Sequence, residues 1–228
     1  MNTAVGNNCA DAITTGNTNV AIGQSALGAT SSGNDNTAVG TSALSTNTTA
    51  SNNTAIGRST LAANTTGTSN VAVGKDALLT NTTGHENIAV GAFSLKLNTD
   101  GTANTAVGYG ALNKNTTADN NIGIGRLALQ ENTTGFRNIA IGNVALNSNT
   151  TASFNVGIGY GALEENQTGT MNTAIGDFAG EKTTGSYNTT VGSNSLRSNT
   201  SGQQNVAVGQ SALFTSTTAS YNTALGYQ

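Results

Sequence analysis

A short unit of the form Asn-(Thr/Val/Ile)-(Ala/Gly)-(Val/Ile)-Gly recurs with little variation along the whole chain. The step between units is 17 residues, except for one step of 16 residues between Asn172 and Asn188. A fixed period of this size, with strand-forming residues in every repeat, is typical of a solenoid. We therefore predict an all-β fold, a single parallel β-solenoid domain over residues 1–228 with about 13 coils and no cap at either end. The units begin at Asn2, Asn19, Asn36, Asn53, Asn70, Asn87, Asn104, Asn121, Asn138, Asn155, Asn172, Asn188, Asn205 and Asn222.

Composition alone would allow a disordered chain. Charged residues are 8% and aromatic residues 4% of the sequence, and Pro and Trp are absent. A typical soluble domain carries roughly 25% charged residues. The strict register of the apolar residues excludes disorder, because a disordered chain has no reason to place Val or Ile once every 17 residues.

Repeat positions are numbered from the Asn, which is position 1. Position 4 is β-branched in every repeat but the last, which predicts a strand with this side chain in the core. Position 2 shares that face, and position 3, nearly always Ala or Gly, points the opposite way. We expect the small-residue face to allow close self-association, and an Asp in place of Ile141 to unfold neighbouring coils.

The remaining positions predict the rest of the coil. The invariant Gly at position 5 indicates a corner with positive φ or close backbone approach. Ala-Leu at positions 8 and 9 predicts a second core layer, and Asn-Thr-Thr-(Gly/Ala) at positions 12 to 15 predicts a turn. Stacked position-1 Asn side chains are expected to form a hydrogen-bonded ladder. The repeat from Asn172 to Tyr187 lacks one residue and has Gly180 where Leu is usual, so we expect a local defect there.

Charge and hydropathy exclude several partners. The net charge of −3 and the scattered basic residues argue against nucleic acid, since phosphate binding needs clustered Lys and Arg. No apolar run approaches the ~20 residues that cross a bilayer, and from the residues after Met1 we expect no signal peptide. Cys9 is the only Cys and takes the small-residue position 8, so we expect a packed thiol.

The repeats Asn-Thr-Ala-Val-Gly, Asn-Val-Ala-Ile-Gly and Asn-Ile-Ala-Ile-Gly resemble the head repeats of YadA-like trimeric autotransporter adhesins. Similar repeats occur in phage and viral tail-fibre-like proteins. The resemblance covers essentially the whole chain and implies a left-handed β-roll, three chains side by side, and a surface that binds host matrix or receptors. The Leu at position 9 and the Asn-Thr-Thr-Gly turn depart from the usual motif of that family.

No catalytic, metal or cofactor site is expected. His85 is the only His, so no Ser-His-acid or Cys-His arrangement can be assembled with enough partners. The Asp residues fall at different repeat positions and do not form a carboxylate pair or a calcium-binding row.

Two repeated patterns offer candidate sites. Asn-X-(Thr/Ser) recurs at position 12, and each Asn would accept a glycan in a glycosylating secretory pathway, although Asn and Thr are also simply good turn residues. These Asn residues are Asn47, Asn64, Asn81, Asn115, Asn132, Asn149, Asn166 and Asn199. A second set of apolar side chains, here named the edge stripe, lies at the end of the later repeats and could stack on sugar rings, dock a neighbouring subunit, or stack along the solenoid. The edge stripe consists of Phe136, Phe154, Met171, Tyr187 and Tyr221.

The sequence thus predicts a non-enzymatic extracellular, cell-surface or virion-surface protein that forms the adhesive head or shaft of a fibre. Its expected partners are further copies of itself, as a side-by-side trimer or an end-to-end filament, and glycans or a host receptor. A purely structural filament is the first alternative. An ice-binding solenoid is a lesser one, because the adjacent Thr residues of the turn, such as Thr65 and Thr66, do not form a flat Thr-X-Thr face.

Overall fold

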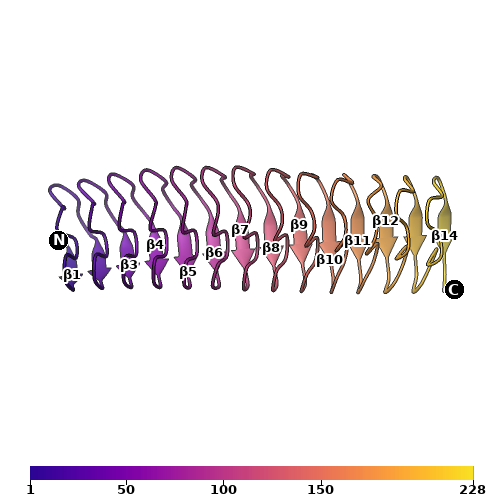
Figure 1. Ribbon diagram of the computed structural model, residues 1–228, viewed down its shortest axis with the longest axis horizontal. Coiled ribbons are helices and arrows are strands. Elements are labelled where there is room, and N and C mark those ends of the chain that lie inside the picture. The colour runs from indigo at the N-terminus through magenta and orange to yellow at the C-terminus, as the bar shows by residue number, and fades with distance from the viewer. Residues whose placement is uncertain (228) are drawn as a thin grey trace. The chain divides into compact units, whose positions relative to one another are not determined.

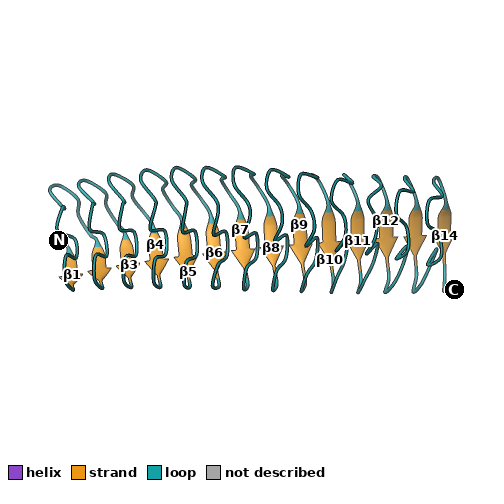
Figure 2. Ribbon diagram, viewed as in Figure 1, coloured by secondary structure: helices purple, strands orange, loops and turns teal. Residues whose placement is uncertain are grey.

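The computed structural model describes residues 1–227, which fall into two compact units, residues 1–118 and 119–227. Each unit is a parallel β-solenoid in which every coil contributes one short strand, joined to the next by turns (Figure 1; Figure 2). The first unit holds β1 (Thr3–Val5), β2 (Val20–Ile22), β3 (Thr37–Val39), β4 (Thr54–Ile56), β5 (Val71–Val73), β6 (Ile88–Val90) and β7 (Thr105–Val107). The second holds β8 (Ile122–Ile124), β9 (Ile139–Ile141), β10 (Val156–Ile158), β11 (Thr173–Ile175), β12 (Thr189–Val191), β13 (Val206–Val208) and β14 (Thr223–Leu225).

Each strand is formed by positions 2 to 4 of its repeat, and neighbouring strands pair in parallel at equal positions. Val20 pairs with Thr37 in the first unit, for example, and Ile139 pairs with Val156 in the second. The predicted fold class, an all-β parallel β-solenoid of about 13 coils, is confirmed. No helix that could span a membrane occurs among the residues described.

The side-chain orientation predicted for the strand is wrong. Position 3 points into the coil, and its Ala residues, such as Ala55 and Ala140, are 0% exposed. Positions 2 and 4 point outward, and Ile141 is 37% exposed. The small-residue face therefore does not provide a surface for self-association, and Asp at Ile141 would not enter the core.

The Leu at position 9 explains why only a small residue fits at position 3. Every one of these Leu side chains from Leu27 to Leu146 is fully buried. This confirms the second core layer that the sequence predicts at position 9. A Cβ added to Gly157 at position 3 would lie 3.3 Å from Cγ of Leu146. The Leu thus spans the thin interior and reaches the strand, and the space that remains accommodates no more than a methyl group.

The corner predicted at position 5 is confirmed. These glycines have φ between 125° and 143°, a conformation that L side chains rarely adopt. A Cβ on Gly91 would also lie 2.5 Å from the carbonyl oxygen of Gly108 in the next coil. Both the backbone conformation and the stacking distance therefore require glycine.

The short repeat keeps its place in the stack. Strands β11 and β12 pair at equal positions across the 16-residue step. Thr190 takes the usual place of Ala at position 3, is 1% exposed, and has its Oγ1 3.6 Å from where a Cβ on Gly180 would lie. The larger Thr side chain thus partly fills the space that the missing Leu leaves. The hydroxyls of Thr183 and Thr190 are buried without a hydrogen-bond partner.

Candidate interaction surfaces

The outward side of the strands is a regular, uncharged surface of each unit. We call it the outer strand face, formed by the side chains at positions 2 and 4 of β1 to β7 in one unit and of β8 to β14 in the other. All of these residues are Thr, Val, Ile or Leu, so the face carries no charge. Away from the end coils its most exposed apolar side chains are 36–41% exposed: Ile22, Ile56, Val71, Ile88, Val90, Ile124, Ile141, Ile175 and Val206.

The outer strand face is comparable in size to the larger apolar patches on typical monomers. Seven parallel strands ~4.8 Å apart, each ~10 Å long, present roughly 340 Å² in each unit. Parallel sheets normally have both faces covered by other parts of the protein. In each unit of this chain, only the inner face of the sheet is covered. Contiguous apolar patches of ~300–600 Å² are the largest on typical monomers and often serve a function.

The sequon asparagines lie in the interior rather than on the surface. All eight are 0% exposed. The Nδ2 of Asn64, for example, donates to Oδ1 of Asn47 at 3.1 Å and to the carbonyl of Gly67 at 2.9 Å. A glycan on Nδ2 would displace both bonds and would need space that the packed coil does not have. Asn47, Asn64, Asn81, Asn115, Asn132, Asn149, Asn166 and Asn199 therefore act as structural turn residues in the folded chain.

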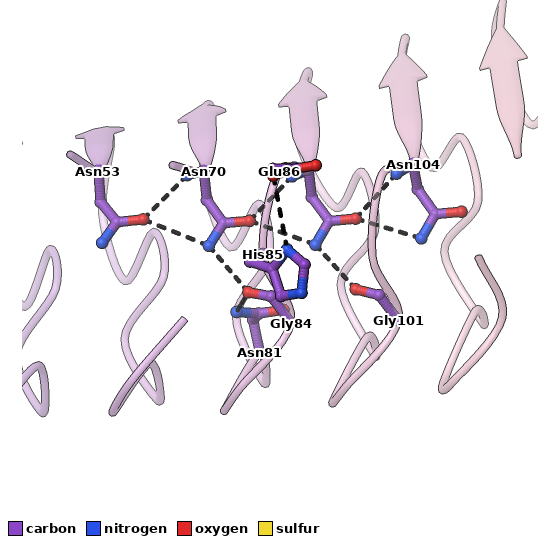
Figure 3. A network of polar contacts seen from close by, with 9 residues as sticks. Asn53, Asn70, Asn81, Gly84, His85, Glu86, Gly101 and Asn104 are labelled. Atoms are coloured by element: carbon purple, nitrogen blue, oxygen red, sulfur yellow. Dashed lines mark hydrogen bonds and ion pairs between the residues drawn. The ribbon is translucent and has the colours of Figure 1, made fainter. Parts of the chain in front are cut away.

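The position-1 asparagines form the predicted ladder, which Figure 3 shows around Asn70. The backbone N–H and the Nδ2 of Asn70 both donate to Oδ1 of Asn53, at 2.9 and 3.2 Å. Its Nδ2 also donates to the carbonyl of Gly84 at 2.9 Å, and that carbonyl accepts a second bond from Nδ2 of Asn81. The two rows of Asn thus share one acceptor per coil, which satisfies buried amides that would otherwise oppose folding.

The five members of the edge stripe all lie on the surface of the second unit. Phe136 is 41%, Phe154 38%, Met171 47%, Tyr187 52% and Tyr221 80% exposed. The rings of Phe136 and Phe154 meet edge to face with centroids 5.0 Å apart. The others make no such ring contact, so stacking along the solenoid does not account for the stripe as a whole.

Two further aromatic pairs were not identified from the sequence. Phe93 and Tyr109 meet edge to face in the first unit, with Nζ of Lys75 5.2 Å from the Phe93 centroid. Tyr160 and Phe178 do the same in the second unit. In both pairs one ring stands at position 6 and the other at position 7 of adjacent repeats. Recording aromatic residues at these two positions together would have revealed the pairs.

Two carboxyl groups, those of Asp100 and Glu164, have shifted pKa values. The described residues contain no group of three His, Cys, Asp or Glu side chains that could hold a metal ion. Hydrogen bonds, chiefly from the hydroxyl of Thr83, lower the pKa of Asp100. Burial and the nearby carboxylates of Glu181 and Glu165 raise the pKa of Glu164. Cys9 is buried, as its position predicts.

Comparisons with protein-family models, with curated proteins and with solved structures found no match.

Proposed function

We propose that the chain is a non-enzymatic module of an extracellular or virion-surface fibre, in which copies associate side by side through the outer strand face. The observation that carries the proposal is the continuous row of half-buried to exposed, mostly β-branched side chains on the strands of each unit. Covering this row removes apolar surface from water without desolvating a charge.

A second copy of the chain is the partner that best suits this face. Each copy carries the same face with the same spacing between coils, so the ridges of one copy can pack between those of another along their length. The likeness to the adhesin head repeats supports three chains around a common axis. The fibre would present its other surfaces as an adhesive head or shaft.

The alternatives have less support. End-to-end stacking would leave the outer strand face exposed to water. Ice-binding solenoids rely on regular Thr ranks, and position 4 of this chain contains no Thr in any repeat. Absence of thermal hysteresis in the purified protein would remove the ice-binding alternative.

The test compares association of the wild-type chain with a variant that carries one charge on the outer strand face of each unit, Ile88→Asp with Ile141→Asp. We expect an oligomer for the wild type in light scattering and a folded monomer for the variant, because a buried unpaired charge opposes association. The matched control is Ser69→Asp with Gln210→Asp, which adds the same charge at exposed positions where Asp35 and Asp177 already occur in other repeats. A monomeric wild type, or an oligomeric face variant, would contradict the proposal.

A further inference from the structure

We infer that the edge stripe is a binding platform for a neutral, extended polysaccharide. This inference rests on the proposed fibre function only in that it assigns the fibre a ligand. The edge stripe and the outer strand face are formed by different repeat positions.

The backbone displays these side chains in a fixed way. Phe154, Met171 and Tyr221 occupy position 17, and Tyr187 occupies the equivalent last position of the 16-residue repeat. The φ angle of these four residues lies between 57° and 63°. Their backbone N–H groups donate to position-16 carbonyls of the preceding coil, as Tyr187 does to Thr170 at 3.0 Å. The backbone therefore holds these side chains outward at the spacing of the coils. Because their positions are fixed before a ligand binds, less conformational entropy is lost on binding.

The chemistry around the rings matches a carbohydrate. Hydroxyl groups stand beside them at position 16, where Ser186 accepts a bond from the backbone N–H of Thr170 and Ser220 accepts one from Gln203. Each of these hydroxyls retains its own proton to donate to a ligand. Rings that stack on the C–H faces of sugars, flanked by hydrogen-bonding groups, suit a polyhydroxylated partner.

Charge and spacing narrow the ligand class. The guanidinium carbon of Arg137 lies 5.7 Å from the centroid of the Phe154 ring. Apart from Arg137, positions 16 and 17 from Phe136 to Tyr221 carry no charge, which favours a neutral glycan. Coils repeat every ~4.8 Å, close to the length of one hexose in an extended chain, so side chains on successive coils can contact successive sugars.

A second copy of the chain is a poorer occupant. An interface between copies of a repeat protein should follow the repeat. The stripe does not, since position 17 is polar or small in the first unit: Thr18, Asp35, Asn52, Ser69, Glu86 and Ala103.

The experiment measures retention of the full chain on particles of cellulose, chitin, mannan and β-1,3-glucan. The variant is Phe154→Ser with Tyr187→Ser and Tyr221→Ser, and Ser69 shows that Ser adopts the required φ at position 17. The control, Tyr109→Ser with Tyr160→Ser, removes exposed rings at position 6. We expect the wild type and the control to bind at least one of these glycans, and the stripe variant to bind it about tenfold less, because several stacking contacts are lost together.

Melting curves and light scattering on the same samples separate the outcomes. A wild type retained on none of the four glycans, or a stripe variant retained as well as the wild type, overturns the inference. A stripe variant that loses association assigns the stripe to contacts between copies and also overturns it. Failure of the outer-face test with intact glycan binding would refute the fibre assembly alone.

Discussion

At the scale of single residues, side-chain size decides what the coil can hold. Leu146 is fully buried beside the strand, whereas Ile141, of similar volume, lies on the outer strand face. We expect Leu146→Ala to cost about 2–5 kcal/mol and Ile141→Ala less than about 1 kcal/mol in a monomeric background. Urea unfolding of the two variants checks this difference. Equal losses would show that the two faces of the strand have been assigned incorrectly.

The position-5 glycines give a second residue-scale prediction. An Ala at Gly91 would have both a disfavoured φ of 131° and a Cβ only 2.5 Å from the carbonyl oxygen of Gly108. Gly28 is a suitable control, since its nearest neighbour to an added Cβ, the carbonyl oxygen of Ser25, is 3.4 Å away. Circular-dichroism melting should show a much lower melting temperature for Gly91→Ala than for Gly28→Ala, and similar temperatures would rule out the stacking distance described.

The Asn ladder makes a prediction that depends on pH. Asp at Asn70 would face two acceptors, Oδ1 of Asn53 and the carbonyl of Gly84, with no proton to donate. Burial and these acceptors disfavour the charge, so the pKa of the introduced carboxyl is expected to be higher in the folded chain than in the unfolded one. The variant should therefore be most stable below the unfolded pKa of ~3.9 and lose stability as pH rises towards the folded pKa, by about 3–5 kcal/mol at neutral pH.

Melts at pH 3.5 and pH 7 test this sign. The control is Asn52→Asp at the neighbouring exposed position, where Asp35 occurs in another repeat, and we expect little pH dependence there beyond that of the wild type. A variant at Asn70 that is equally destabilised at both pH values would mean that the buried charge is not the cause.

At the scale of elements, the coil from Asn172 to Tyr187 is the weakest part of the repeat pattern. It lacks the buried Leu, and the hydroxyls of Thr183 and Thr190 have no partner. We expect this coil to be the least protected in hydrogen exchange. Thr190→Val should increase stability by about 1 kcal/mol, because it removes an unpaired buried hydroxyl at nearly constant volume. Uniform protection, or a destabilised Val variant, would refute this description.

At the scale of the whole molecule, association through the outer strand face should have the signature of an apolar interface. Positions 2 and 4 carry no charge in either unit, so raising NaCl to about 1 M should not dissociate the oligomer, in contrast to one held by ion pairs. Cooling should weaken it, because hydrophobic stabilisation falls at low temperature. Light scattering across salt and temperature measures both effects, and dissociation by salt would indicate a different interface.

The sequence by itself determined the repeat, the register of the strands, the glycine corner, the buried Leu and the Asn ladder. Each of these depends on a requirement within one repeat, such as φ at Gly91, or on the stacking of identical side chains in successive repeats, and the repeated sequence displays both. The sequence did not determine which side of the strand faces inward. The alternation of side chains along a strand places Ile139 and Ile141 on one face and Ala140 on the other. It does not determine how wide the interior is, and therefore which face points inward.

Only the tertiary structure decided that width. The Leu at position 9 crosses the coil and leaves room for Ala140 alone, which turns the β-branched residues outward. The same thin interior contains both rows of Asn, and this removes the sequons from the surface. The two candidate surfaces also differ in whether the sequence alone could reveal them. The edge stripe could be identified from the sequence because its residues recur at the end of the later repeats, whatever the interior of the coil contains. The outer strand face could not, because the buried Leu at position 9 decides which side of the strand points outward.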